Sequence, residues 1–238
     1  MQNIKFIGKC LLVRTEGWEI LVVGDLHLGY EESLNRSGVF VSRKLFEEMI
    51  EYFDKVFEKT GRVDEIVLLG DIKHDFGRIS QQEWSDYLKL VRFLEKKCGK
   101  IVITKGNHDK ILEFMTRKGE KVELKDYYLI NEFAFFHGDK SFAEVYDKKI
   151  KYWVMGHAHP AVKITDGVKI EKFKCFFVGK FEKREVIIVP SFIAANEGSD
   201  PRENDLGLAW KFNFDKFDVK VVSDENLKTL DFGILRKL

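Results

Sequence analysis

Short apolar runs alternate with longer amphipathic stretches through the first half of the chain. Residues 42–59 repeat large apolar side chains at helical spacing and stop before Gly61, which favours a helix end. Residues 80–97 begin with Ser80 and Glu83, the pair that forms a capping box, and keep their apolar side chains on one face. Strands are expected at 20–23, 65–69 and 101–104, and a further short helix at 111–118. This alternation is typical of an α/β layered fold.

The second half of the chain has mostly the patterns of strands. Asp166-Gly167, placed between Ile164 and Val168, is the signal of a hairpin turn. Residues 141–150 are expected to form a helix, with Ser141 and Glu144 as its capping box. The expected strands cover 121–130, 133–136, 152–155, 169–177, 185–189, 206–214 and 217–222, whereas the pattern of 226–238 is ambiguous.

Length and composition indicate an ordinary globular protein. The chain has 238 residues, 45% of them hydrophobic, which suffices for one domain covering residues 1–238. Its 40 Lys and Arg nearly balance 39 Asp and Glu, so a net charge of +1 gives no global field for a polyanion. The three cysteines form no CxxC pair and are expected to be reduced thiols. No apolar segment approaches the ~18 uncharged residues of a membrane span, so we expect a cytoplasmic protein with no membrane partner and an oligomeric state that the sequence leaves open.

All six histidines fall within five short polar motifs. The motifs contain Asp25 and His27 (GDLH), Asp71 and His74 (GDIKH), Asn107, His108 and Asp109 (GNHD), His137 (HG), and His157 and His159 (GHAH). Each motif follows an apolar run that is expected to be a strand. In open α/β sheets, ligands bind beyond the carboxyl ends of the strands. The five segments are therefore expected to converge on one edge.

Metal binding explains the series of motifs better than local structure does. A single Asp after a strand is more often a helix cap than a metal ligand. Capping, however, requires neither a His two residues after the Asp nor a GHxH motif. Alternate residues of an extended DxH or HxH segment point the same way, so both side chains can reach one ion. A mixed set of imidazole, carboxylate and amide ligands suits manganese, iron or zinc.

The ordered set DxH, GDxxH, GNHD, an isolated His and GHxH resembles the calcineurin-like metallophosphoesterase superfamily. Residues 25–31 (DLHLGYE) and 70–76 (GDIKHDF) are similar to archaeal and bacterial phosphoesterases related to the repair exonucleases and to the DNA-ligase-associated phosphoesterase. The resemblance runs from about Val23 to Asp200. It implies a four-layer α/β/β/α sandwich of two mixed sheets flanked by helices.

The resemblance also implies a role for each motif residue. The first metal would be held by Asp25, His27 and His159, the second by Asn107, His137 and His157, and Asp71 would bridge the two. His108 would be the general acid, oriented by Asp109. The implied cofactors are two divalent ions, with Mn²⁺ favoured and Fe, Zn, Ni or Co as alternatives.

Charge indicates the class of substrate. Two divalent ions bring four positive charges and the ligands Asp25 and Asp71 return two negative ones, so the surplus favours a bridging hydroxide and an anionic ester such as a phosphate. We expect His74 to hydrogen-bond a ligand carboxylate, with substrate contact or capping of Asp75 as alternatives. Candidate phosphate contacts are Arg36 and Lys73, although a solvated surface cation is the simpler interpretation of each.

Two further segments have compositions that suit ligand contact. Residues 30–41 are rich in polar side chains and are expected to form a loop over the active site. Residues 172–184 interleave cations with aromatics, as in a platform that stacks on bases and contacts phosphates. The simpler interpretation of the second segment is a hairpin with Phe inside and Lys outside.

The sequence thus predicts a metal-dependent phosphoesterase. The resemblance favours phosphodiesters, nucleic-acid or nucleotide ones among them, although net charge gives nucleic-acid binding no support. A phosphomonoesterase acting on nucleotides or phosphoproteins would share every ligand. A non-catalytic scaffold in a repair complex is the alternative from another class, and the presence of His108 and of all seven implied ligands argues against it.

Overall fold

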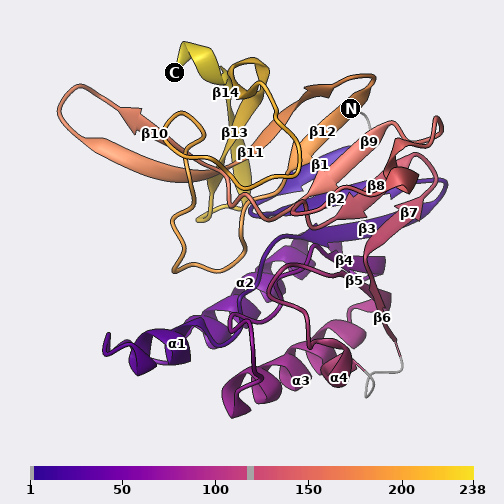
Figure 1. Cartoon of the computed structure of the whole chain (residues 1–238), viewed down its shortest axis with the longest axis vertical. Coiled ribbons are helices and arrows are strands. Elements are labelled where there is room, and N and C mark those ends of the chain that lie inside the picture. Colours follow the sequence, from indigo (N-terminus) through magenta and orange to yellow (C-terminus); the bar gives the residue numbers. More distant parts are fainter. Residues whose placement is uncertain (1–2, 117–120) are drawn as a thin grey trace.

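The computed structural model describes residues 3–116 and 121–238, which form two β-sheets packed face to face, with helices over the outer face of the first sheet (Figure 1). The first sheet has the strand order β1-β2-β3-β4-β5-β6. Its strands are β1 (Ile4–Ile7), β2 (Cys10–Thr15), β3 (Trp18–Val23), β4 (Val63–Leu68), β5 (Cys98–Thr104) and β6 (Val122–Lys125). Strands β3 to β6 run parallel, and β1 and β2 add an antiparallel edge. The three strands predicted in this half are confirmed, and the β1–β2 pair is an addition.

The helices of the first half lie where their apolar spacing predicts them. Helix α2 (Leu45–Thr60) buries Met49, Phe53, Val56 and Phe57. Helix α3 (Gln81–Glu95) begins after Ser80, whose side chain accepts from the Glu83 amide while the Glu83 side chain returns to Ser80, as the capping box predicts. The short helix expected at 111–118 is α4 (Glu113–Thr116), and positions 117 and 118 lie outside the described residues.

The second sheet is mixed and has the order β14-β13-β11-β12-β9-β8-β7, with β10 paired to β11. Its strands are β7 (Tyr127–Ile130), β8 (Phe133–Phe136), β9 (Tyr152–Met155), β10 (Ala161–Thr165), β11 (Ile170–Phe181), β12 (Arg184–Ile188), β13 (Asp218–Ser223) and β14 (Lys228–Ile234). The pairs β8–β9 and β9–β12 are parallel and the others antiparallel. Two mixed sheets with flanking helices confirm the predicted fold class.

The inner faces of both sheets meet in an apolar layer. Val22 and Val67 from the first sheet belong to the same buried cluster as Phe135, Val154 and Phe176 from the second. Strands β3, β4 and β5 therefore carry apolar side chains on both faces, which explains their continuous apolar runs. Because Phe176 and Phe177 are fully buried, the 172–184 segment is a core hairpin rather than an exposed stacking platform.

Four predicted elements differ in the structure. The strand expected at 121–130 is divided into β6 of the first sheet and β7 of the second. Residues 206–213 form a loop and not a strand, and Phe214 begins the 3₁₀ turn η2 (Phe214–Lys216). The aromatic side chains of this segment pack against the core of the second sheet, but its backbone joins no sheet. The helix expected at 141–150 is only a 3₁₀ turn, η1 (Ala143–Tyr146), preceded by Phe142 with no side-chain cap. The tail, for which the sequence predicted no element, forms β14 and η3 (Leu235–Lys237). The loop expected at 30–41 begins instead as helix α1 (Tyr30–Arg36), whose acidic first turn and basic last turn suit the helix dipole.

The helices of residues 3–116 and 121–238 are all too short or too polar to cross a membrane.

Candidate metal centre

The five histidine motifs meet at one end of the sandwich. Asp25, Asp71 and Asn107 follow β3, β4 and β5 of the first sheet, and His137 and His157 follow β8 and β9 of the second. Four motif residues have a left-handed backbone that costs energy for any side chain other than glycine. Their φ angles are 46° at His27, 47° at Asp71, 64° at His157 and 42° at His159. Such strain at residues that carry the candidate chemistry is typical of a functional site.

Asp25, His27 and His159 form the first group of candidate ligands. His159 Nε2 lies 3.3 Å from Asp25 Oδ1 and 3.2 Å from His27 Nε2. Burial would raise the pKa of Asp25, but the neighbouring His159, His137 and His27 hold it below its usual range. Burial lowers the pKa of His27 to about 3, so its imidazole is neutral and can bind a metal.

Asp71, His137 and His157 form the second group, and Asn107 joins it. His137 Nε2 lies 3.0 Å from His157 Nδ1, 3.1 Å from Asn107 Oδ1 and 3.5 Å from Asp71 Oδ2. Asp71 also faces the first group, because its Oδ2 lies 3.9 Å from His27 Nε2. The seven residues predicted as ligands are therefore brought together, with Asp71 between the two groups.

In three of the candidate histidine ligands, the ring nitrogen that faces away from the metal centre has a polar partner. That partner fixes which nitrogen of the ring faces the metal centre. His137 Nδ1 lies 2.7 Å from the Leu69 carbonyl oxygen, and His157 Nε2 lies 3.1 Å from that of Gly207. His159 Nδ1 lies 2.6 Å from Asn196 Nδ2. The sequence does not predict these supports, since Asn196 and Gly207 belong to loops with no pattern of their own. They leave Nε2 of His137, Nδ1 of His157 and Nε2 of His159 free to bind a metal.

The donor set fits divalent metal ions. Imidazole nitrogens approach one another and two carboxylates at 3.0 to 3.5 Å, an arrangement that a shared cation would stabilise. His27 Nδ1 is buried without a hydrogen-bond partner among the described residues. The mixture of imidazole, carboxylate and amide donors suits manganese, iron or zinc.

His108 lies beside Asp71 and is held by a partner that the sequence did not predict. Its backbone amide donates to Asp71 Oδ1 at 3.0 Å, and its ring Nε2 lies 3.7 Å from Asp71 Oδ2. Its ring Nδ1 contacts the His74 carbonyl oxygen. The Asp109 carboxylate, predicted to orient His108, instead accepts the amides of Gly106 and Ile72, each at 3.0 Å. Asp109 therefore fixes the loop backbone, and burial together with the Asp71 charge raises its pKa to about 7.

His74 lies against both His27 and His108. The ring centroids are 5.4 Å apart for His74 and His27 and 5.7 Å apart for His74 and His108. Among the described residues its buried Nδ1 has no hydrogen-bond partner, so the expected bond to a ligand carboxylate is absent from that atom. The contribution of His74 that the structure does show is its carbonyl oxygen at the His108 ring.

The two candidate phosphate contacts have other partners. Lys73 is only 1% exposed, and its Nζ lies 3.5 Å from the His108 carbonyl oxygen and 3.9 Å from Glu83 Oε1. Lys73 is thus neither a surface cation nor accessible to substrate, so both interpretations were wrong. The sequence could not show this, because Lys73 is buried only by the packing of the GNHD loop over it. Arg36 is paired with Asp75, which raises the pKa of Arg36.

A partly buried lysine supports the segment behind Asp25. Lys174 Nζ donates to the Ser191 carbonyl at 2.8 Å and to Ser191 Oγ at 3.0 Å, and also contacts the Ile193 carbonyl. Between these two residues, the Phe192 amide donates to the Asp25 carbonyl at 2.9 Å. Lys174 thus anchors the loop that holds the backbone of the first ligand.

Titration of Lys174 is expected to affect stability. Burial lowers its pKa from 10.5 to about 7, so over this window the unfolded chain binds a proton that the folded chain lacks. The free energy of unfolding gains a contribution that rises with pH, by at most about 1.4 kcal/mol per unit. The raised pKa of His137 contributes an opposite slope, which both chains share. We therefore expect the slope of the unfolding free energy against pH, measured by urea denaturation between pH 7 and 9, to be more positive in the native chain than in Lys174→Met. Equal slopes would contradict the assignment.

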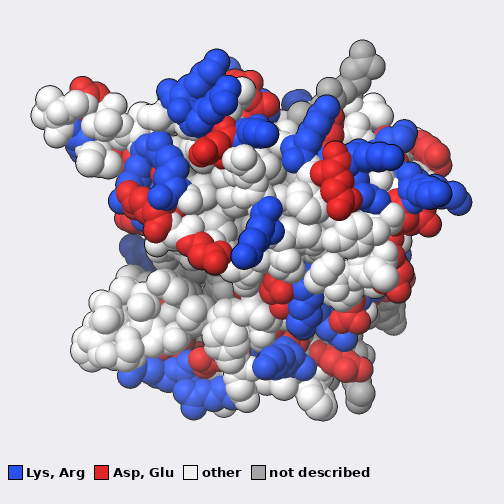
Figure 2. Space-filling model, turned by 45° about the horizontal axis from the view of Figure 1, so that its top comes forward, with Lys and Arg blue, Asp and Glu red and all other residues white. Residues whose placement is uncertain are grey.

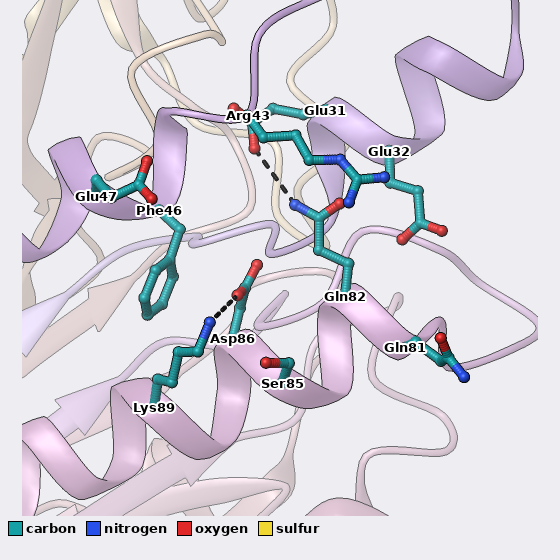
Figure 3. A pocket seen from close by; sticks show the side chains of 10 residues that line it. All are labelled: Glu31, Glu32, Arg43, Phe46, Glu47, Gln81, Gln82, Ser85, Asp86 and Lys89. Atoms are coloured by element: carbon teal, nitrogen blue, oxygen red, sulfur yellow. Dashed lines mark hydrogen bonds and ion pairs between the residues drawn. The ribbon is translucent and has the colours of Figure 1, made fainter.

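A separate cavity of about 410 Å³ lies between α1 and α3 (Figure 3). Gln82 of α3 points toward Glu31 of α1, and Lys89 pairs with Asp86 at 3.6 Å along one wall. Glu31 also accepts the Leu45 amide at 2.7 Å, which ties α1 to the start of α2. No predicted metal ligand lines this cavity, so it belongs to the helical layer and not to the metal centre.

Comparison with known proteins gives the family. The model for calcineurin-like phosphoesterases matches residues 19–223. The chain resembles the crystal structure of the nuclease MPE from Pseudomonas putida, with a TM-score of 0.58, 16% identity and coverage of 93% of this chain and 100% of that one. It also resembles the E. coli phosphoesterase Yfce (TM-score 0.49, 14% identity, coverage 90% and 98%) and Vps29 from Cryptosporidium parvum (0.41, 13%, 90% and 97%). No curated protein matches the chain. The chain therefore belongs to the calcineurin-like phosphoesterase family, and it is a metal-dependent hydrolase.

Proposed function

We propose that this hydrolase cleaves phosphodiesters with two divalent metal ions, preferably Mn²⁺. The observation that carries the proposal is the position of Asp71, whose Oδ2 lies 3.9 Å from His27 Nε2 of the first group and 3.5 Å from His137 Nε2 of the second. A carboxylate shared by two ligand groups suits a pair of ions better than a single one.

The residues that would hold the ions come from both sheets. The first ion would be held by Asp25, His27 and His159, the second by Asn107, His137 and His157, and both by Asp71. Two such ions lower the pKa of a water molecule and stabilise negative charge on a phosphoester.

His108 is the residue we assign to the leaving group. In the protonated ring, Nδ1–H donates to the His74 carbonyl, and Nε2–H is left on the side of Asp71 and the two ligand groups. When the P–O bond to the leaving alcohol breaks, this Nε2–H gives its proton to the departing oxygen.

The choice of a diester rests on the family likeness and on one comparison. The Pseudomonas putida protein that shares this fold is a nuclease. On the face shown in Figure 2, Lys and Arg are interspersed with Asp and Glu, so a long polyanion meets no continuous basic track there. We therefore propose nucleotide or short nucleic-acid diesters, bound by local contacts at the metal centre.

Hydrolysis of bis(4-nitrophenyl) phosphate beside 4-nitrophenyl phosphate tests the proposal. With Mn²⁺ we expect a higher kcat/KM for the diester, and loss of both activities after chelation with EDTA. Restoration by added Mn²⁺ is the control for irreversible unfolding. A higher kcat/KM for the monoester would establish the phosphomonoesterase alternative instead, and absence of metal-dependent turnover would favour the scaffold.

A further inference from the structure

An exposed aromatic ring covers the proposed general acid. The Phe76 and His108 rings stack with centroids 3.6 Å apart and planes 30° apart. Phe76 is nevertheless 54% exposed, so part of its ring faces solvent beside the proposed general acid. One face of the phenyl ring contacts the imidazole, and the exposed part of the ring is available to a ligand.

The segment that carries Phe76 is firmly held. Glu83 Oε1 accepts the amides of His74 at 3.1 Å and Asp75 at 2.9 Å. The Asp75 carboxylate pairs with Arg36 and with Arg78, the latter at 3.4 Å. These contacts fix the backbone immediately before Phe76 and the charged groups around it. The ring is therefore presented in place before any substrate arrives, which reduces the entropy cost of a contact with it.

The position of Phe76 places it beside the leaving alcohol of the substrate. An oxygen that takes a proton from His108 Nε2 must lie within hydrogen-bond reach of that ring. The remainder of the leaving alcohol is then next to the aromatic ring stacked on the same imidazole. Resting on the proposed function, we propose that Phe76 determines specificity by stacking on the base of a leaving nucleoside.

A nucleoside suits this position better than an alkyl alcohol. A base offers a flat π-face, and stacking between bases and aromatic side chains tolerates any base. Arg36 and Arg78 flank the segment through Asp75, where they can meet phosphate oxygens of the same nucleotide strand. An alkyl group would gain only the smaller apolar contact.

Thymidine 5′-methyl phosphate provides a direct test, because its phosphorus carries two competing leaving alcohols. Water adds to phosphorus, one P–O bond breaks, and the departing oxygen takes the proton of His108. Departure of thymidine leaves methyl phosphate, whereas departure of methanol leaves thymidine 5′-phosphate. Chromatography of the products of the Mn²⁺-loaded full chain gives the ratio of the two cleavages. We expect the native chain to release mainly thymidine, and Phe76→Ala to lower that ratio about 10-fold.

The product ratio separates stacking from a merely structural role. Both cleavages use His108, so a change in its position alone slows both and leaves the ratio unchanged. Phe76→Leu, which keeps apolar cover but lacks a flat ring, should behave like Phe76→Ala, and Phe76→Trp should behave like the native chain. A native ratio in the Ala or Leu variant, or no thymidine preference in the native chain, would overturn this inference alone. Absence of any diester hydrolysis by the native chain would overturn the proposed function as well.

Discussion

Replacing His108 by asparagine is expected to lower kcat for a dinucleotide such as thymidylyl-thymidine by about 10²- to 10⁴-fold. An alkoxide is a poor leaving group, so its departure depends on the proton that His108 Nε2 supplies. The hydrogen bond from the His108 backbone amide to Asp71 Oδ1, at 3.0 Å, does not involve the His108 side chain and is kept in the variant. Steady-state kinetics with saturating Mn²⁺ measures the loss.

The leaving group provides the control for this prediction. 4-Nitrophenolate departs without protonation far more readily than an alkoxide, so the loss in His108→Asn should be smaller for the aryl diester. Metal content should stay at the native level, since His108 is not among the proposed ligands. Equal rates of native and variant chains on the dinucleotide would remove the acid assignment, and a fall in metal content would make His108 a ligand.

Replacing Asp71 by asparagine is expected to lower the occupancy of both metal sites. Asp71 Oδ2 faces His27 on one side and His137 on the other, and the side chain is 3% exposed, so solvent cannot compensate for the lost charge. The amide keeps the size of the carboxylate and an oxygen for the His108 amide. Elemental analysis of the dialysed, Mn²⁺-loaded chain gives the number of ions per chain.

Two matched variants distinguish the bridging role from a general loss of structure. Asp25→Asn should weaken only the first ion, and His157→Gln only the second, so each should retain more metal than Asp71→Asn. The Asp71 carbonyl accepts the amides of Leu26 at 3.1 Å and His27 at 2.9 Å, and these backbone bonds do not depend on its side chain. If Asp71→Asn loses one ion and keeps the other, Asp71 belongs to a single site.

The strands of the inner layer could be predicted from sequence because burial on both faces produces an unmistakable apolar run. Residues 206–214 show where that argument fails. Alternate residues there, including Trp210, Phe212 and Phe214, are apolar as in a strand, and they do pack on the second sheet. Their backbone, however, has no partner strand. Period-two alternation reports an extended segment with one covered face and does not report sheet pairing.

The cluster of candidate ligands could be predicted because each ligand lies in a local motif after a strand. The roles of Lys73 and Asp109 could not. Both residues act on backbone groups of segments distant in sequence, the His108 carbonyl for Lys73 and the Ile72 amide for Asp109. Such contacts exist only once the loops have folded together, so the spacing of residue types along the chain cannot predict them. Asn196 was missed for the same reason.

The origin of the ligands in two separate sheets has a further consequence. Asp25 and Asp71 are attached to strands of the first sheet, and His137 and His157 are attached to strands of the second. A slide of one sheet across the other would pull the carboxylates away from these imidazoles. The spacing of the ligands is therefore set by the interlocking of side chains such as Phe135 along the seam, remote from any chemistry.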